Sequence, residues 1–313
     1  MAIASYIRKN FVLFGALTAN LGIAVAKFVA AGMTGSSSML SEGFHSVVDS
    51  LNQVLLLYGE HRADRPPDRE HPFGYGRELY FWAFVVAILI FSVGAGLSVY
   101  EGYVHWVSPE ELTDPTINYI VLGVAFLMEG TSWGIAIREF ASTKGDQGWW
   151  EAVKQSKDPS VFIVLFEDSA ALAGLIVAAV GVWASHYFDA PRLDGLASIA
   201  IGLILAMVAV LLAREAKGLL IGERADFALI ERIRAVVDKQ DWITAVNHVR
   251  TVHTSPKQVF AAISADIEDE VTMGEGERLI EELEDQLREA VPELSSIYVR
   301  PEKAEDAASP PGE

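Results

Sequence analysis

Hydrophobic residues are gathered into long runs over the first two thirds of this 313-residue chain. Three uncharged runs are near the ~20 residues with which a helix crosses a bilayer. They are Asn10–Ala26, Leu79–Tyr100 and Gly195–Ala213. Two more apolar segments are interrupted only by acidic residues: Pro115–Ile137 by Glu129, and Pro159–Phe188 by Glu167 and Asp168. Together with Met39–Tyr58, this pattern predicts six membrane-spanning helices.

Basic residues occupy alternate loops between these spans, namely Arg62, Arg65, Arg69 and Arg77 after the second and Arg138, Lys144, Lys154 and Lys157 after the fourth. Because basic loops stay in the cytoplasm, both termini are expected there. The first run is long and lacks a convincing small-residue cleavage site, so we interpret it as a span and not as a signal peptide. We expect an integral, multi-pass protein of a bacterial-type inner (plasma) membrane.

From about Leu219 onward the pattern changes to short helical and strand periodicities. A helix follows an Asp226 cap, Val259–Ile267 alternates with period two, and a second helix opens at a Thr272–Glu275 capping box. With flanking strands at Trp242–His253 and Ser296–Arg300, the order αββαβ predicts a small open-faced sheet with two helices on one side. The expected fold is thus a membrane α-helical bundle of six transmembrane helices plus a small α+β, ferredoxin-like C-terminal domain. We place the transmembrane domain at 1–218, the cytoplasmic domain at 219–301 and a disordered acidic tail at 302–313.

Overall composition agrees with this division. The chain is 51% hydrophobic and carries a net charge of −18, of which −11 falls after Leu219, where 21 acidic residues face 10 basic ones. An acidic domain argues against nucleic-acid binding. The absence of cysteine excludes disulfides and thiolate metal ligands. No phosphate loop or nucleophile motif is found, so we do not expect an enzyme.

The second span contains the candidate chemistry. His45 and Asp49 are four residues apart and leave one face of a helix as a two-ligand metal clamp, with Glu42 one turn earlier to extend a polar path. An imidazole with a carboxylate suits zinc or another borderline divalent metal. The same spacing also arises by chance, but ionisable groups within a span are costly and mark ion or proton paths. Glu129 lines such a path, carries a proton or pairs with a group such as Lys27. Lys27 itself either snorkels to the interface or pairs with an acid such as Glu42.

The loop after the second span reads RPPDREHPFGYGR, in which Asp68 and His71 form a candidate weak metal site. PPDREHPFGYGR after an HxxxD span resembles the cation diffusion facilitators, whose loop commonly reads much like PADREHPFGHGR. Three further stretches resemble the branch that contains a mitochondrial zinc transporter: SSSMLSEGFHSVVDSLNQVLL, MEGTSWGIAIREF and KDPSVFIVLFEDSAALAGL.

The resemblance implies an ion site between the second and fifth spans. Asp168 matches the aspartate of the family in the fifth span, but Val164 stands where members carry His or Asp four residues earlier. We therefore expect a transport site of His45, Asp49 and Asp168, completed by Glu167 or water. Glu167 is alternatively a hydrogen-bonded supporting group.

The implied function is efflux of a divalent cation, expected to be Zn²⁺, by proton-coupled alternating access with H⁺ as counter-ion. Mn²⁺, Fe²⁺ or another divalent cation, another cargo moved with a proton relay, and a non-transporting metal-binding scaffold remain alternatives. The C-terminal domain is expected to form a homodimer. Ser264, Glu277 and Tyr298 stand where many members have zinc-binding histidines, leaving His248 with His253 nearby, so no full metal cluster is expected in it.

Overall fold

The computed structural model describes residues 11–109, 115–145, 148–149, 152 and 156–307. The chain divides into two compact units. The first runs to Glu60 and resumes over Phe81–Ala216, and the second comprises His61–Tyr80 and the chain from Lys217 onward. The loop after the second predicted span therefore groups with the C-terminal unit, which the sequence boundaries of 1–218 and 219–301 did not anticipate.

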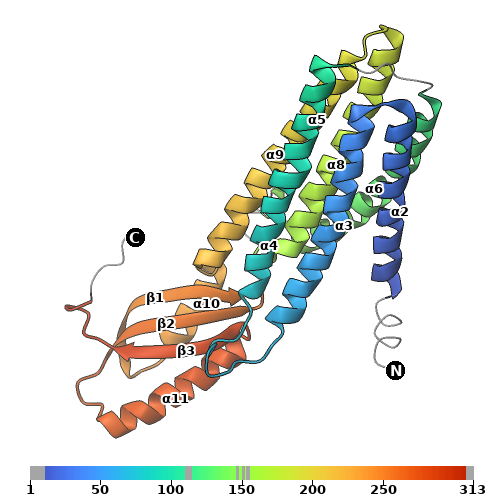
Figure 1. Cartoon of the computed structure of the whole chain (residues 1–313). Helices are drawn as coiled ribbons and strands as arrows, with labels where there is room; N and C mark the ends of the chain where they lie inside the picture. The colour runs from blue at the N-terminus through green and yellow to red at the C-terminus, as the bar shows by residue number, and fades with distance from the viewer. Residues whose placement is uncertain (1–10, 110–114, 146–147, 150–151, 153–155, 308–313) are drawn as a thin grey trace. The chain divides into compact units, whose positions relative to one another are not determined.

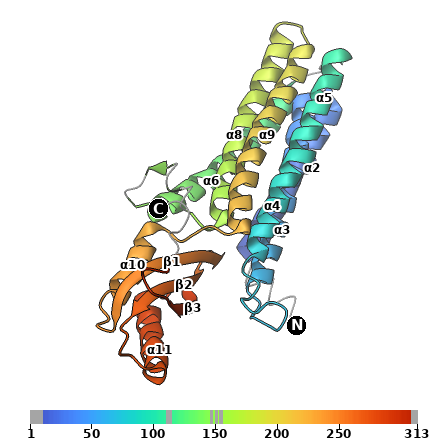
Figure 2. The same ribbon diagram turned by 90° about the vertical axis from the view of Figure 1, so that its left-hand side faces the viewer.

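The first unit is a bundle of long helices that run side by side in both views (Figures 1 and 2). Its elements are α2 (Phe11–Thr34), α3 (Ser37–Ala63), α4 (Glu78–Leu89), the π-helix η1 (Ile90–Ala95), α5 (Gly96–Val107), α6 (Thr116–Thr143), α8 (Pro159–Tyr187) and α9 (Arg192–Ile221). Within the described residues, five helices are long and apolar enough to cross a membrane, counting α4, η1 and α5 as one.

Helix α3 matches these five in length, with 27 residues, but is more polar. Its exposed large hydrophobic side chains follow one stripe, at Val47, Leu51, Val54 and Tyr58. Its buried side holds Glu42, His45, Asp49 and Asn52. A helix with its apolar face outward and its polar face inward is suited to a lipid environment, because in water the polar face would be the exposed one. Helix α3 thus supplies the sixth predicted span.

Small residues let α9 approach its neighbours closely. A Cβ on Gly102 of α5 would collide with the backbone of α9 at Gly195, and one on Gly202 would meet the α5 backbone at Val99. Because lipid provides no hydrophobic drive between helices, such close contact is a main source of helix association in membranes. These glycines thus serve the packing of α9 against α5.

A buried carboxylate fixes the start of α3. Asp194 of α9 is fully buried and accepts hydrogen bonds from the backbone N–H groups of Ser37 (2.5 Å) and Ser38 (3.2 Å). The hydroxyls of Ser36 and Ser38 donate to its other oxygen. Negative charge at a helix N-terminus satisfies free N–H groups and complements the helix dipole. Asp194 therefore anchors the helix that carries the candidate ligands.

The C-terminal unit contains α10 (Phe227–Val237), β1 (Ile243–Ser255), β2 (Gln258–Ile267), α11 (Met273–Ala290) and β3 (Leu294–Pro301), which confirms the predicted αββαβ order. The sheet order is β1-β2-β3, with β1 antiparallel and β3 parallel to β2. Both helices contribute to one core, in which Ile233 and Leu283 are fully buried against Ile263.

The two predicted helix caps have different outcomes. Asp226 caps α10 by accepting a hydrogen bond from the Leu229 N–H at 2.7 Å, as the sequence predicts. Thr272 is the residue before α11, but its side chain makes no capping hydrogen bond, so the predicted capping box is not formed. Glu302 to Ala307, placed in the predicted tail, are described, and the Ala304 N–H donates to Asp266 at 2.9 Å. Residues 308–313 lie outside the described part.

We expect Asp194→Asn to lower the free energy of unfolding of the detergent-solubilised protein by about 1.5–3 kcal/mol, the range for a hydrogen bond to a charged group. The asparagine keeps the shape but turns an N–H donor toward the α3 amides. Thermal unfolding followed by circular dichroism measures the loss. Asp189→Asn is the matched control, because Asp189 is exposed in a left-handed turn (φ 52°) that asparagine adopts readily. Equal unfolding midpoints for the two variants would contradict the anchoring role of Asp194.

Candidate metal transport site

The polar face of α3 is a stripe over three helical turns, formed by Glu42, His45, Asp49 and Asn52. At about 100° per residue, their positions fall within an arc of about 80° on the helix surface. All four are buried, with exposed fractions of 0%, 1%, 8% and 0%. The i, i+4 geometry predicted for His45 and Asp49 is thus present within a larger buried stripe.

At the end nearer the α2–α3 turn, the stripe is closed by Lys27 of α2. Its ammonium group donates to Glu42 Oε2 at 2.9 Å and to the Ser46 hydroxyl at 2.8 Å. Lys27 is 1% exposed and therefore pairs with Glu42 instead of snorkelling, which was one of the two alternatives from the sequence. Gly174 of α8 lies against the Glu42 carboxylate, and a Cβ there would collide with it. This glycine provides space for a charged group.

At the opposite end, the stripe meets Glu167 of α8. The Asn52 amide nitrogen donates to Glu167 Oε1 at 2.5 Å. The carboxyl group of Glu167 is also within hydrogen-bonding reach of the Asp49 carboxyl group. Two ionised carboxylates in contact repel each other unless a proton or a cation lies between them. Glu167 thus faces the α3 ligands directly.

Asp168 faces a different helix. It is half-buried and accepts a hydrogen bond from the Ser132 hydroxyl of α6 at 2.9 Å. The next residue, Ser169, accepts one from the Trp133 indole at 2.9 Å. The structure therefore brings Glu167 to Asp49 and Asn52 and places Asp168 against α6. Within the described residues, no three His, Asp or Glu side chains converge closely enough to hold a metal ion in this conformation.

Several polar atoms of the stripe are buried without a hydrogen-bond partner among the described residues. They are Glu42 Oε1, both ring nitrogens of His45, Asp49 Oδ1 and Asn52 Oδ1. The His45 Nδ1 to Asp49 Oδ1 distance is 3.2 Å, but the geometry is not that of a hydrogen bond. An unsatisfied buried polar group costs about 1–3 kcal/mol. An imidazole nitrogen with carboxylate and amide oxygens is a donor set that fits a divalent cation such as zinc.

Glu129 of α6 is buried, with 8% of its surface exposed. It lies close enough to Lys27, Asp168 and Glu42 to interact with them electrostatically. This position is compatible with each of its predicted roles, namely a group that lines the path, a proton carrier and a partner for Lys27.

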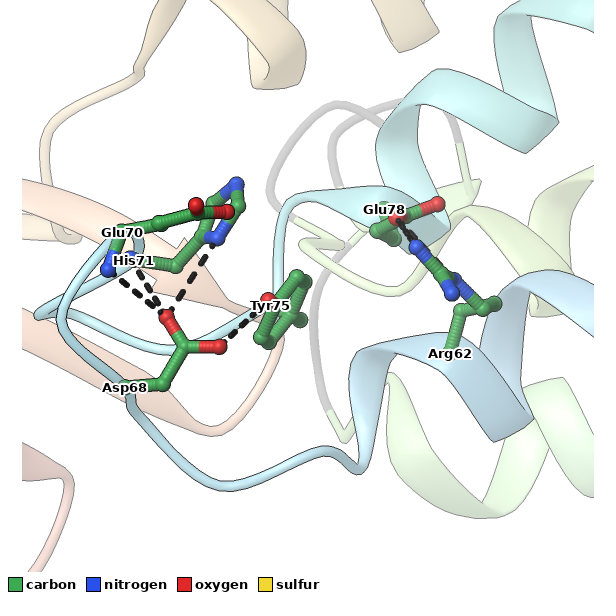
Figure 3. Close-up of polar contacts among 6 residues, drawn as sticks. All are labelled: Arg62, Asp68, Glu70, His71, Tyr75 and Glu78. Atoms are coloured by element: carbon green, nitrogen blue, oxygen red, sulfur yellow. Dashed lines mark hydrogen bonds and ion pairs between the residues drawn. The ribbon is translucent and has the colours of Figure 1, made fainter.

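The Asp68 carboxylate organises the loop between α3 and α4 (Figure 3). It accepts hydrogen bonds from the backbone N–H groups of Glu70 (2.9 Å) and His71 (2.8 Å) and from the Tyr75 hydroxyl (2.7 Å). The Tyr75 hydrogen bond, followed by that from the His71 backbone, lowers the pKa of Asp68 below its ordinary value. The His71 ring nitrogen is 3.6 Å away. Both carboxylate oxygens thus hold the loop conformation, and the predicted loop metal site stays a prediction.

Tyr75 stands where the resembling motif has histidine. Its ring lies 4.2 Å from that of His71 and is within 6 Å of the guanidinium groups of Arg62 and Arg65. Arg62 also pairs with Glu78 at 2.8 Å (Figure 3). A phenol ring near two arginines and His71 replaces a potential nitrogen ligand, so the loop gains structural contacts from this position.

Within the C-terminal unit, the loop packs on the sheet. The Phe73 ring meets that of Phe260 on β2 at 5.7 Å, edge to face. On the same strand, the Ser264 hydroxyl donates to Glu302 at 2.7 Å, and His248 is its partner across β1 and β2. His253 is buried near the Ser255 carbonyl. Ser264 thus forms a hydrogen bond at a position where many family members are expected to carry a zinc-binding histidine.

A bundle of apolar helices that buries ionisable side chains in a stripe is typical of membrane proteins that move ions or protons. Residues 13–221 match the family model of the cation efflux transmembrane domain, and residues 225–304 match that of the cytoplasmic domain of cation efflux proteins. The chain belongs to the cation efflux family, which consists of transporters and not enzymes. This confirms the resemblance to the cation diffusion facilitators.

Among characterised relatives, the chain is 32% identical to the mitochondrial proton-coupled zinc antiporter SLC30A9 of Xenopus laevis over 228 residues, which is 72% of this chain and 41% of that protein. Identity to metal tolerance protein C4 of Arabidopsis thaliana is 32%, over 67% of this chain and 47% of the relative. Identity to the manganese efflux system protein MneP of Bacillus subtilis is 22%, over 91% of this chain and 92% of the relative. The chain therefore spans less than half the length of the SLC30A9 proteins it matches.

Asn52 also lies on the polar side of α3, although the sequence alone indicates no contact for it. Its i+7 spacing from His45 was the available signal, because it returns the side chain to the same helix face. Ser132 received no role, since nothing in a single sequence shows that a serine on one span faces an aspartate on another.

We expect Tyr75→Phe to raise the pKa of Asp68 toward its ordinary value, because the variant removes the hydroxyl that stabilises the ionised carboxylate. Because the pKa of Asp68 is lowered in the folded protein, its ionised carboxylate stabilises the loop at pH values above the ordinary pKa of aspartate. This stabilisation is lost as the pH falls through the lowered pKa. Carboxyl-carbon NMR titration of the full-length protein measures the shift. Tyr298→Phe, an exposed position on β3, is the control. An unchanged Asp68 titration would show that the tyrosine hydroxyl does not stabilise the carboxylate.

Proposed function

We propose that this protein exports a divalent cation, with Zn²⁺ as the physiological ion, by proton-coupled alternating access. The observation that carries the proposal is the set of unpartnered donor atoms of His45, Asp49 and Asn52 that meets Glu167 inside the bundle. Buried donors of this kind need a cation or protons to offset their desolvation. The zinc antiporters among the relatives support Zn²⁺ as the ion.

The ion is bound by His45, Asp49 and a carboxylate of α8. In the conformation described, Glu167 is the α8 carboxylate that lies beside Asp49, and the three groups would bind the ion after a small movement of α8 relative to α3. A larger rotation or displacement would bring in Asp168 instead. A site with three protein ligands and an exchangeable position suits a carrier, which must release its ion, whereas a closed four-ligand site would retain it.

Proton coupling follows from the chemistry of the ligands. A metal ion binds neutral imidazole and ionised carboxylates, so binding displaces protons and proton binding displaces the metal. Because Asp49 and Glu167 are in contact, a proton and a cation compete for one place. Release on the acidic side of the membrane is therefore favoured, and the proton gradient drives the cycle.

The orientation that we propose has both termini in the cytoplasm of a bacterial-type cell, with the protein in the plasma membrane. The basic loops after α3 and α6 support it by the positive-inside rule. Aromatic side chains gather at both ends of the bundle, with Tyr58 and Trp82 at one end and Trp183 and Tyr187 at the other. Such aromatic residues are typical of the two membrane interfaces.

We further propose that the protein works as a homodimer joined through the αββαβ domain, without a full metal cluster in that domain. The match to the cytoplasmic domain of cation efflux proteins supports this assembly.

Manganese is the second candidate ion. Apart from His45, the donors that meet in the stripe are oxygens, and carboxylate and carbonyl oxygens suit Mn²⁺. The similarity to a manganese efflux protein over nearly the full length of both chains adds to this alternative.

We expect His45→Ala and Asp49→Ala each to reduce the initial rate of Zn²⁺ uptake into proteoliposomes by at least about tenfold, since loss of even a supporting group at a metal site costs about 10–100-fold. A zinc-sensitive dye trapped inside the vesicles measures uptake. Val54→Ala, on the exposed apolar face of α3, is the matched control and should retain the wild-type rate. Wild-type rates in both ligand variants would remove these residues from the transport site.

We expect uptake to depend on the proton gradient in a defined direction. Acidifying the side that donates zinc should slow uptake, because protons compete for the ligands there, and acidifying the receiving side should accelerate it. The measurement is dye-reported uptake with a pH step on either side, repeated with a protonophore to collapse the gradient. Rates that are the same in all conditions would rule out antiport while leaving metal transport intact.

A further inference from the structure

We propose that Asn52 is a specificity-determining residue of the transport site, where its amide nitrogen positions Glu167 and its amide oxygen is a further metal ligand. This inference rests on the proposed function and refines it by adding a residue and a preference among divalent cations.

The position of Asn52 places it on the ligand face. It lies seven residues after His45 and three after Asp49, so the three side chains project from α3 within an arc of about 60°. Asn52 is fully buried. An asparagine without exposure in a membrane-spanning helix is costly, and its cost is offset only if both halves of the amide find partners.

One half of the amide has a partner and the other has none. The nitrogen donates to Glu167 Oε1 at 2.5 Å, whereas the oxygen is buried without a hydrogen-bond partner among the described residues. The reverse orientation would place two acceptors against each other when Glu167 is ionised. The amide is therefore fixed with its oxygen available to a cation while its nitrogen holds the glutamate.

The contact with Asn52 also distinguishes between two adjacent carboxylates. Asp168 is next to Glu167 in sequence but is about 100° around the helix and is bound by Ser132 of α6. Among the hydrogen bonds and ion pairs of the described residues, Asp168 has none to α3, whereas Asn52 and Asp49 both reach Glu167. Asn52 therefore determines that Glu167 is the α8 group beside the α3 ligands.

With Asn52 included, the donors are one imidazole nitrogen, two carboxylates and one amide oxygen. After a small movement of α8 toward α3, these four groups would surround the ion without Asp168, and their two negative charges would match a divalent cation. The amide oxygen is a neutral, hard ligand of the kind that Mn²⁺ accepts more readily than softer metals. Asn52 should therefore contribute more to Mn²⁺ transport than to Zn²⁺ transport.

The test compares Asn52→Leu, which removes both halves of the amide at similar volume, with Asn52→Asp, which keeps an oxygen ligand. Zn²⁺ and Mn²⁺ uptake are measured separately in proteoliposomes, with apparent KM and maximal rate for each ion. We expect Asn52→Leu to raise the apparent KM about tenfold for Zn²⁺ and more for Mn²⁺. In Asn52→Asp, the ratio of Mn²⁺ to Zn²⁺ transport should equal or exceed that of the wild type.

A double variant tests the positioning of Glu167. If Asn52 acts through Glu167 as well as on the ion, the fold-reduction in uptake rate of the double variant Asn52→Leu with Glu167→Gln should be smaller than the product of the fold-reductions of the two single variants. Asn52→Gln is the conservative comparison, since it retains the amide but displaces it by one methylene group. Retained thermal unfolding midpoints show that each variant is folded, and Asn52→Asp supplies the readout if the leucine variant is unstable.

The outcomes separate this inference from the proposed function. If the wild type transports neither ion, the proposed function fails. If the wild type transports metal but Asn52→Leu and Asn52→Asp leave the KM values and the Mn²⁺ to Zn²⁺ ratio unchanged, only the role of Asn52 is overturned. If Asn52→Leu and Asn52→Asp each reduce Zn²⁺ and Mn²⁺ transport by the same factor, the proposed role of the Asn52 amide oxygen as a metal ligand is overturned.

Discussion

The contact between the Asp49 and Glu167 carboxyl groups is the constraint on which the rest of the site depends. Neither group is able to reach water freely inside the bundle, and two negative charges at this separation are not stable without a compensating positive charge. A proton and a metal ion both provide one, but they exclude each other. In the proposed mechanism, the Asp49 and Glu167 carboxyl groups therefore both attract the cation and, when a proton binds between them, release it.

The surrounding bundle holds this contact in place from several directions. Asp194 anchors one end of α3, and the Lys27–Glu42 pair occupies the polar stripe at the same end. Gly174 provides room for Glu42 on the side of α8. A charge that is already paired adds little attraction for a further cation. Glu42 keeps one oxygen without a hydrogen-bond partner, but its charge is paired, so the proposed cation would be attracted mainly to the His45, Asp49 and Asn52 segment of the stripe.

Helical and strand periodicity predicted much of this molecule, because the features concerned are local. The six spans, the αββαβ order and the shared face of His45 and Asp49 follow from spacing along one element. The choice between Glu167 and Asp168 did not follow, since it depends on how α8 is rotated against α3, and a rotation of about 100° exchanges the two side chains. Thr272 illustrates the same limit: its sequence predicts a capping box, but the final side-chain geometry does not form one.

Adjacent carboxylates that face different helices also link those helices mechanically. Glu167 is bound to α3 through Asn52, whereas Asp168 and Ser169 are bound to α6 through Ser132 and Trp133. The two contacts to α6 are made by neutral donors that need no cation, so α6 and α8 remain joined whether or not metal is present. The contact to α3 is different, because it includes the carboxylate pair whose stability depends on what lies between its members. In the proposed transport cycle, binding and release of the ion would therefore change the α3–α8 interface more than the α6–α8 interface, and movement would begin at the α3–α8 interface.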